Sequence, residues 1–434
     1  MSKTAERISD APAVIVGGGA AGLAAACAIG RGAVVLEHRQ QPGLKLLATG
    51  GGRCNLTHCG APEDIAAQFG RAARFVAHVF RACPPDAIRA FFEDAGVATV
   101  VEGDGCVFPR SGRAADVRDA LVRTAESRGV RFRCGCRAVR LRVVREDGGE
   151  RGTVAGVETT DGFIPASRVI LAAGGCCRAA LGSDGSGVAI AREAGLEVVS
   201  PVPALVGLRC DVPWMTGLAG VSCDDVDIRM RLPSGAAGRA STVRAGGGLV
   251  FTHAGISGPA ALAISGTVSE CLAGGAAAEL TLAVVGGADE NDWRGQFARW
   301  RREHGAMHVA NLMARHIPRA LAQALCHAAN VPDGRTAAAL RRDEERSLAR
   351  LCGSCPVRID GTDGWDGAMV TRGGVALREL VPSTLACRRV ANLHCIGEVV
   401  DVDAPCGGYN LSWAFAGGFV QGRIRQGDGI PAER

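Results

Sequence analysis

A glycine motif between a buried strand and a helix constrains the fold of this chain more than any other feature. Residues 13–16 (AVIV) form an apolar run without alternation, which is typical of a strand buried on both faces of a parallel sheet. Gly17, Gly19 and Gly22 follow in G-x-G-x-x-G spacing and open an Ala-rich segment that predicts a helix. A second apolar run, 33–36, comes next. This order predicts a βαβ unit and therefore an α/β fold.

The same unit predicts a dinucleotide site. Glycines at this spacing permit a tight turn and a close approach of backbone N–H groups to a pyrophosphate, and the helix N-terminus favours its negative charge. Ala21 lies inside the motif, and Glu37 ends the second apolar run, twenty residues after Gly17. A carboxylate there can accept from both ribose hydroxyls and disfavours a 2′-phosphate. The motif predicts NAD or FAD and does not distinguish between them.

The length indicates more than one domain, because single cores stop growing at about 250–300 residues and this chain has 434. Changes in composition and in hydrophobic pattern along the chain predict four parts. They are a first part of the dinucleotide-binding domain (1–195), a β-rich insertion (196–288), a helical insertion rich in Arg, Glu and Ala (289–350) and a second part of the dinucleotide-binding domain (351–434).

Composition argues against several classes of protein. The net charge is +5, and arginines are interleaved with acidic residues, so we expect no nucleic-acid partner. There is no signal peptide and no apolar run of membrane-spanning length, so we expect a cytoplasmic protein without a membrane partner. The 18 cysteines are expected to be reduced thiols, and no pair has zinc-site spacing with matching partners, so no metal is expected. Cys352 and Cys355 have CxxC spacing but follow a charged helical segment, and nothing in the sequence indicates an oligomeric state.

Later segments favour FAD over NAD. An antiparallel meander is predicted around 139–159, and it leads to an apolar strand, 168–171, that ends in Ala173 and Gly174. A simple NAD dehydrogenase does not require this arrangement, whereas disulfide-reductase-like flavoproteins carry such a strand and glycine turn. Near the end, 396–411 is typical of a strand, a loop and a helix start, whose N–H groups could stabilise negative charge on a reduced flavin.

Three longer motifs resemble one family. The segments LKLLATGGGRCNLTH (44–58), FTHAGISGPA (251–260) and GEVVDVDAPCGGYNLSWAFAGG (397–418) are similar to those of bacterial FAD-dependent flavoproteins that include aminoacetone oxidase-like and 3-dehydro-bile-acid reductase-like members. The similarity covers nearly the whole chain. It implies a glutathione-reductase-like, Rossmann-like FAD-binding domain with an inserted β subdomain and an inserted helical subdomain.

The resemblance also implies residue roles. Gly17, Gly19 and Gly22 would contact the pyrophosphate and Glu37 the adenosine ribose. The remaining cofactor residues would lie along the flavin, the ribityl chain and the pyrophosphate: Lys45, Gly51, Gly52, Arg53, Cys54, Asn55, Gly397, Glu398, Gly408, Tyr409, Asn410 and Leu411. His58 and Cys406 depart from the family pattern, in which Asn and Thr are usual. Two alternatives stay open, namely that Arg53 pairs with a surface carboxylate and that Cys54 is a buried, inert thiol.

These features predict an FAD-dependent oxidoreductase of a small organic molecule. We expect hydride transfer at flavin N5, with reduction of an activated C=C bond or a ketone by transiently bound NAD(P)H, because no second complete G-x-G-x-x-G follows a strand. His253 and Tyr409 are the candidate proton donors, although His253 is equally a turn histidine and Tyr409 a core aromatic. The alternatives are an oxygen-dependent amine or aminoketone oxidase and a tRNA-modifying or RNA-binding flavoprotein that docks through the arginines of 294–350.

Two rare residue types coincide with these motifs. Lys3 and Lys45 are the two lysines of the chain, and Tyr409 is its one tyrosine. Lys45 lies in the first of the family motifs and Tyr409 in the last. We therefore expect both side chains to serve the flavin site.

Overall fold

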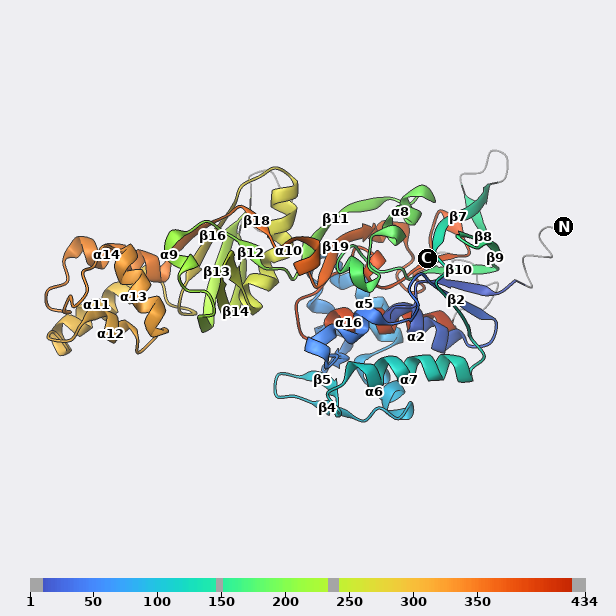
Figure 1. The fold of residues 1–434 in the computed structure, drawn as a ribbon, viewed down its shortest axis with the longest axis horizontal. Coiled ribbons are helices and arrows are strands. Elements are labelled where there is room, and N and C mark those ends of the chain that lie inside the picture. The colour runs from blue at the N-terminus through green and yellow to red at the C-terminus, as the bar shows by residue number, and fades with distance from the viewer. Residues whose placement is uncertain (1–10, 146–150, 233–241, 424–434) are drawn as a thin grey trace. The chain divides into compact units, whose positions relative to one another are not determined.

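The chain forms two compact units. The computed structural model describes residues 11–145, 151–232 and 242–423 (Figure 1). Unit 1 consists of Met1–Pro201 and Val370–Arg434, and unit 2 is the intervening Val202–Met369. The four-part division made from the sequence stays a prediction. Lys3 lies outside the described residues.

A five-stranded parallel sheet forms the centre of unit 1, in the order β21-β10-β1-β2-β6. Its middle strand β1 consists of the apolar run that opens the chain, and the strands on either side, β2 and β10, are also almost completely buried. The predicted α/β fold is confirmed. The bounds are β1 Ala13–Val16, β2 Ala33–Glu37, β6 Arg131–Cys134, β10 Arg168–Leu171 and β21 Leu393–Cys395.

Helix α2 (Ala20–Ile29) packs against α16 (Tyr409–Val420) and α7 (Ala114–Ser127) (Figure 1). Small residues allow α2 and α16 to approach closely. A Cβ on Gly418 would lie 2.5 Å from the carbonyl oxygen of Ala21. The first residue of α16 is Tyr409, so this contact fixes the GGYN motif relative to the helix that follows the first glycine motif.

Smaller elements complete unit 1. The predicted meander is present as β7, β8 and β9, and a separate three-stranded sheet has the order β3-β5-β4. The bounds are α3 Leu44–Leu47, β3 Thr57–His58, α4 Pro62–Ala67, α5 Ala73–Ala82, α6 Pro85–Asp94, β4 Thr99–Val101, β5 Cys106–Pro109, β7 Ala138–Arg145, β8 Gly152–Thr159, β9 Gly162–Pro165, α8 Ser186–Glu193, β11 Val198–Ala204, β19 Val370–Val375 and β20 Val390–Ala391.

Unit 2 combines an antiparallel sheet with a group of helices. The seven strands have the order β17-β16-β13-β14-β15-β12-β18. Buried side chains of the sheet and of the helices belong to one hydrophobic core, which includes Phe251, Trp293 and Leu348. The bounds are β12 Leu208–Arg209, α9 Pro213–Thr216, β13 Ser222–Arg231, β14 Thr242–Thr252, β15 Gly255–Ser257, α10 Pro259–Ala273, β16 Ala278–Ala283, α11 Glu290–Glu303, α12 Val309–Met313, α13 Arg319–Ala328, α14 Arg342–Gly353, β17 Cys355–Ile359, β18 Gly361–Thr362 and α15 Gly364–Gly367.

A buried histidine in the central sheet makes the stability of the protein depend on pH. His394 in β21 is 5% exposed, and its Nδ1 donates to the Thr384 carbonyl oxygen at 3.2 Å. Burial and the nearby Arg168 lower the pKa of His394 from 6.5 to about 4. Between pH 6.5 and about pH 4, His394 becomes protonated in the unfolded chain but stays neutral in the folded protein. The contribution of His394 to the free energy of unfolding is therefore fully present above pH 6.5, and about 3 kcal/mol is lost as the pH falls to about 4.

We expect urea unfolding at about pH 7 and about pH 4.5 to show a loss of roughly 2–3 kcal/mol that the His394→Asn variant does not share. The asparagine amide can still donate to Thr384, but it does not titrate. His78, which is exposed on α5, gives the control variant His78→Asn, whose pH dependence should match that of the wild type. An equal pH dependence in wild type and His394→Asn would contradict this explanation.

Candidate functional site

The first glycine motif forms the turn between β1 and α2. Gly17 has a φ of 103°, which L side chains rarely adopt, and a Cβ there would lie 2.5 Å from the Ala172 carbonyl oxygen. A Cβ on Gly22 would lie 1.9 Å from the Gly17 carbonyl oxygen. Gly19 caps α2, and a Cβ there would meet no atom within 4 Å. The turn is therefore tightly packed on the side of Ala172 and open at the N-terminus of α2. Backbone N–H groups at a helix N-terminus attract an anion.

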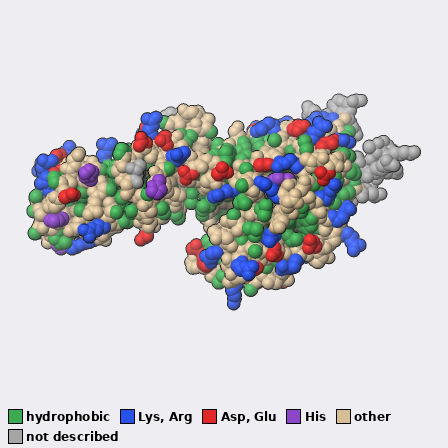
Figure 2. Space-filling view, viewed as in Figure 1, with side chains coloured by type: hydrophobic (Ala, Val, Ile, Leu, Met, Phe, Trp, Pro, Cys, Tyr) green, Lys and Arg blue, Asp and Glu red, His purple; other side chains and the backbone are tan. Residues whose placement is uncertain are grey.

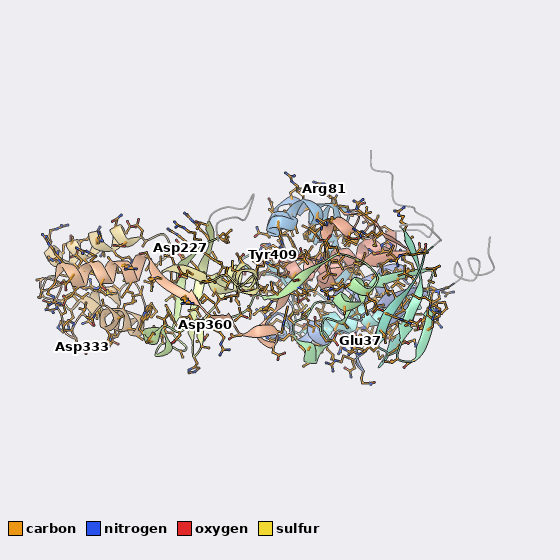
Figure 3. The ribbon with its side chains drawn as sticks, turned by 90° about the horizontal axis from the view of Figure 1, so that it is seen from above. Glu37, Arg81, Asp227, Asp333, Asp360 and Tyr409 are labelled. Atoms are coloured by element: carbon orange, nitrogen blue, oxygen red, sulfur yellow. The ribbon has the colours of Figure 1, made fainter. Side chains whose placement is uncertain are left out.

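Glu37 ends β2 and is joined to this turn by a hydrogen bond. Its side chain, labelled in Figure 3, is largely buried. Its Oε2 accepts from the Gly18 N–H at 3.0 Å. Its Oε1 accepts from the Arg39 N–H at 2.8 Å. A carboxylate oxygen can accept about two hydrogen bonds, so Oε2 has capacity for a further donor such as a ribose hydroxyl.

The glycines of the GGGRCN segment leave part of its backbone uncovered by side chains. Gly50 and Gly51 have φ values of 56° and 66°, in the left-handed region. A Cβ on Gly51 or Gly52 would meet no atom within 4 Å. The absence of side chains leaves room for a ligand to approach this loop, as the resemblance implies for both glycines.

The next two side chains of this segment point elsewhere. Arg53 forms an ion pair with Glu102, and its guanidinium carbon lies 4.1 Å from the ring centroid of Phe108. This is the surface pair that the sequence left open as an alternative. Cys54 is completely buried, and burial raises its pKa to about 12, so the thiol stays protonated at neutral pH. Both observations favour structural roles for these side chains.

Asn55 connects the GGGRCN segment to the GGYN motif. In the orientation that gives both its amide nitrogen and its amide oxygen a hydrogen-bond partner, Asn55 donates to the Thr57 carbonyl oxygen at 2.9 Å. Its amide oxygen then accepts from the Gly408 N–H at 3.1 Å. Gly408 caps α16 with a φ of 87°, and a Cβ there would lie 2.6 Å from the Thr57 carbonyl oxygen. Two motifs separated by about 350 residues therefore meet at one point.

The start of α16 carries the predicted Tyr409, Asn410 and Leu411. The Tyr409 ring stacks on His58, with centroids 4.9 Å apart and planes 17° apart, and burial raises the pKa of the Tyr409 phenol. Asn410 accepts from the Ala404 N–H at 3.0 Å and donates to the Ala404 carbonyl oxygen at 2.8 Å, so it holds the preceding loop. Leu411 packs against the core. Of the three, Tyr409 is the side chain with a group suited to proton transfer.

Lys45 and Glu398 contact each other in a network that links distant segments. Lys45 Nζ lies 2.7 Å from Glu398 Oε2 and 2.9 Å from Cys177 Sγ. The Thr371 N–H donates to Glu398 Oε1 at 2.8 Å, and the Cys177 thiol donates to the same oxygen at 3.2 Å. Burial lowers the pKa of Lys45, but attraction to Glu398 and Cys177 outweighs it and the pKa lies above its usual value. Burial raises the pKa of Glu398, yet Lys45 holds it below its usual value, so both groups are charged at neutral pH.

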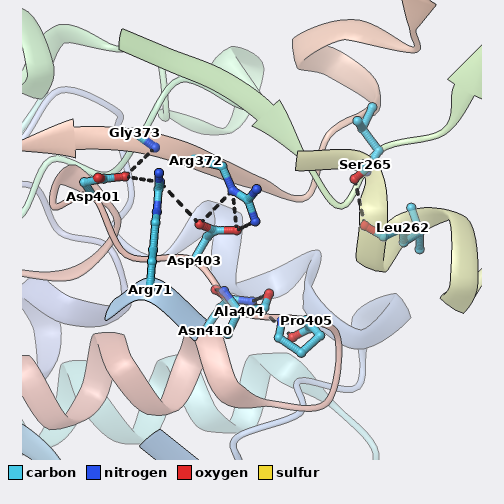
Figure 4. Close-up of polar contacts among 11 residues, drawn as sticks. Arg71, Leu262, Ser265, Arg372, Gly373, Asp401, Asp403, Ala404, Pro405 and Asn410 are labelled. Carbon is cyan, nitrogen blue, oxygen red and sulfur yellow. Dashed lines mark hydrogen bonds and ion pairs between the residues drawn. The ribbon is translucent and has the colours of Figure 1, made fainter. Parts of the chain in front are cut away.

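A second charged cluster holds the loop before the GGYN motif, and the sequence did not indicate it (Figure 4). Arg71 Nη2 lies 2.6 Å from Asp401 Oδ1, which also accepts from the Gly373 N–H at 2.9 Å. Arg372 donates to both carboxylate oxygens of Asp403, with its nearest contact at 2.8 Å. The partners are separated by up to 330 residues along the chain. No local pattern could have paired them.

The remaining predicted cofactor residues of unit 1 lie in the turns that follow strands β10 and β21. Gly397 has a φ of 70°, and a Cβ there would lie 2.7 Å from Ala21 Cβ. Gly174 has a φ of 73°, and a Cβ there would lie 3.1 Å from Ser183 Oγ. Ala173 precedes Gly174 and lies two residues after the end of β10 at Leu171. The geometry explains why these positions carry small residues, and contact with FAD stays a prediction for them.

His253 lies in a different unit from the other predicted residues. It is exposed in the tight turn between β14 and β15 of unit 2. A turn position is one of the two interpretations of His253 that the sequence allowed. Its role as a proton donor stays a prediction.

Other features of the described residues bear on the class of site. Over 11–145, 151–232 and 242–423, no group of three or more His, Cys, Asp or Glu side chains is arranged to hold a metal ion. Cys352 and Cys355 are buried, and burial raises the pKa of both thiols, that of Cys355 to about 12. Among the same residues no helix is both long and apolar enough to span a membrane.

Comparison with known proteins decides the family. The Rossmann domain of HI0933-like proteins matches residues 11–424. The chain belongs to the HI0933-like family. A 3-dehydro-bile acid delta(4,6)-reductase of Clostridium scindens is 32% identical over 420 residues, which cover 94% of this chain and 97% of that protein. A ribosomal RNA dihydrouridine synthase of Escherichia coli is 30% identical, with 93% and 95% covered, and one of Haemophilus influenzae is 25% identical, with 94% and 96% covered.

Membership of the HI0933-like family makes the protein an FAD-dependent oxidoreductase, as the sequence predicted. The residues present fit this cofactor. The Gly17–Gly22 turn leaves open space at a helix N-terminus, Glu37 offers acceptor capacity beside it, and the Gly51–Gly52 backbone is uncovered. Bound FAD supplies a group that accepts and donates hydride. The relatives' activities leave open whether this family member acts on a small molecule or on RNA.

Proposed function

We propose that the protein reduces a carbon–carbon double bond conjugated to a carbonyl group in a small organic molecule, with NAD(P)H as the source of electrons. The relative with 32% identity over nearly both full lengths is named for the reduction of such bonds in a 3-dehydro-bile acid. This observation carries the proposal. It supports the reaction class and leaves the identity of the substrate to experiment.

The residues around the start of α16 suit such a reaction. Reduction of a conjugated double bond adds hydride at the β carbon and a proton at the α carbon, so the site needs a proton donor. Tyr409 is a buried phenol whose pKa is raised, and it therefore keeps its proton at neutral pH. Stacking on His58 fixes its ring. We assign the proton donor to Tyr409, with His253 as the alternative.

A ribosomal RNA uridine is the second candidate substrate. Two relatives are named as ribosomal RNA dihydrouridine synthases, and the C5=C6 bond of uridine is also conjugated to a carbonyl. In unit 2, Glu290, Glu344 and Glu345 are engaged by arginines, whereas exposed residues such as Arg299 and Arg319 form no ion pair within the described residues. Blue and red side chains are interspersed on the face that Figure 2 shows, so an RNA contact on that face would rest on individual arginines.

One anaerobic stopped-flow experiment separates these proposals. FAD-loaded protein is mixed with NADH or NADPH, and the reduced enzyme is then mixed with a 3-oxo-4-ene steroid, with deproteinised ribosomal RNA or with oxygen. We expect NADH or NADPH to bleach the flavin absorbance, and we expect the steroid to reoxidise the reduced flavin rapidly. Tyr409→Phe should slow reoxidation by about 100-fold and leave bleaching unchanged, because it removes the acid and retains the stacked ring.

Each other outcome has a distinct meaning. Reoxidation by RNA with formation of dihydrouridine would replace the small-molecule proposal by the RNA candidate. Fast reoxidation by oxygen alone, with an amine as reductant, would support the amine oxidase alternative. Absence of bleaching by both nicotinamides would contradict the use of NAD(P)H. Unchanged reoxidation in Tyr409→Phe would remove Tyr409 as the acid.

A further inference from the structure

Three buried polar atoms lack a hydrogen-bond partner in the described part of the chain, and two of them belong to the residues that directly follow Glu37. They are His38 Nε2, Arg39 Nε and Ser183 Oγ. The two segments that carry them adjoin, because a Cβ on Gly182 would lie 3.3 Å from His38 Cε1 and 3.5 Å from Arg39 Cγ. Leaving a buried polar atom unpaired costs about 1–3 kcal/mol, so such a group of atoms indicates a missing partner.

The protonation of His38 determines what kind of partner fits. Its Nδ1 lies 3.3 Å from Glu37 Oε1, and an ionised carboxylate can only accept, so Nδ1 is the nitrogen that carries the hydrogen. Burial lowers the pKa of His38; Glu37 and Asp184 oppose this shift, while Arg137 and Arg39 add to it. The ring is therefore neutral at neutral pH, and its Nε2 is an acceptor. A phosphate oxygen, which also accepts, cannot satisfy it, whereas a hydroxyl or an amino group can.

The position of these atoms identifies the donor. Glu37 binds the glycine turn through Gly18 and faces His38 with its other oxygen. A carboxylate at the end of the second strand of such a unit lies at the ribose of the nucleotide nearest the turn. In FAD that nucleotide is the adenosine half, which carries ribose hydroxyls and an exocyclic amino group as neutral donors.

We propose that His38, through Nε2, accepts a hydrogen bond from the adenosine half of FAD and that Ser183 makes a second contact with the same half. The two residues then distinguish a dinucleotide from a mononucleotide flavin. His38 also extends the acceptor surface of Glu37, so this end of the site recognises an unphosphorylated ribose through two adjacent side chains.

The test is the affinity of the full-length protein, freed of flavin, for FAD and for FMN, which lacks adenosine. Dissociation constants come from quenching of flavin fluorescence. We expect His38→Ala to raise the dissociation constant for FAD about five- to tenfold and to leave that for FMN unchanged within about twofold. Ser183→Ala should act in the same direction, and His38→Gln should restore part of the affinity, because its amide oxygen can accept. His78→Ala, at an exposed position of α5, is the matched control.

Two results would overturn the proposal: an unchanged FAD affinity in His38→Ala, or an equal weakening of FAD and FMN. Thermal unfolding of the flavin-free variants shows whether His38→Ala folds, and if it does not, His38→Gln and Ser183→Ala decide alone. The proposal rests on the assignment of the Gly17–Gly22 turn to FAD. Normal FAD binding by Gly22→Ala would show that this assignment fails, which is distinct from a failure of His38 alone.

Discussion

Replacing Lys45 by methionine is expected to lower the free energy of unfolding by about 2–4 kcal/mol and to reduce the amount of FAD that co-purifies with the protein. The side chains of Lys45 and Glu398 are 25% and 22% exposed, so water screens their ion pair only in part. Methionine removes the positive charge and leaves Glu398, which Thr371 and Cys177 also contact, as an uncompensated carboxylate. The measurements are urea unfolding with and without added FAD, and the flavin content of the purified protein.

Two further variants show whether charge compensation is the cause. Adding Glu398→Gln to Lys45→Met should recover part of the lost stability, because the uncompensated charge is then gone. Arg133→Met breaks the exposed pair between Arg133 and Asp161 in the same unit, and its effect should be much smaller. If Lys45→Met and Arg133→Met cost the same, the network of Lys45 does not hold the site together.

Gly22→Ala is expected to weaken FAD binding by about 100-fold or more. The added Cβ would lie 1.9 Å from the Gly17 carbonyl oxygen, which is a backbone atom that cannot rotate away. Gly17 has little freedom to shift, because it packs against the Ala172 carbonyl oxygen on its other side. The N–H groups at the start of α2 then lose the arrangement that attracts an anion. A titration of the flavin-free protein with FAD measures the effect.

The matched control for this change is Gly103→Ala. A Cβ on Gly103 would meet no atom within 4 Å, and its φ lies outside the left-handed region. This variant should bind FAD as the wild type does. Equal affinities for FAD in Gly22→Ala and Gly103→Ala would mean that the turn does not hold the pyrophosphate.

Local features of the fold could be predicted because they depend on neighbouring residues. The first strand, its glycine turn and α2 were expected from the sequence, since steric limits on φ and the apolar pattern act over a few residues. Glu37 lies where its spacing from Gly17 placed it, at the end of β2. The meander and the helical character of α11 to α14 also followed from periodicity.

The partners of individual side chains could not be predicted in the same way. Arg53 follows two uncovered glycines in the sequence, but its charge is taken up by Glu102 and its guanidinium lies over Phe108. Asn410 lies in the GGYN motif, but its amide is occupied by the backbone of Ala404. In each case the motif indicated a segment near the cofactor, and packing decided which way the side chain points.

The sequence by itself determined the α/β unit, the dinucleotide turn and the kind of cofactor, because these depend on short-range spacing and on motifs that stay intact along the chain. Only the tertiary structure decided that Lys45 meets Glu398 across 353 positions, and that Asn55 meets Gly408. It also brought the ring of His38, with its unpartnered nitrogen, against the position of Gly182. Such pairs depend on the crossing of strands and helices, since burial forces charges and hydrogen-bonding groups to find partners wherever the chain brings them together.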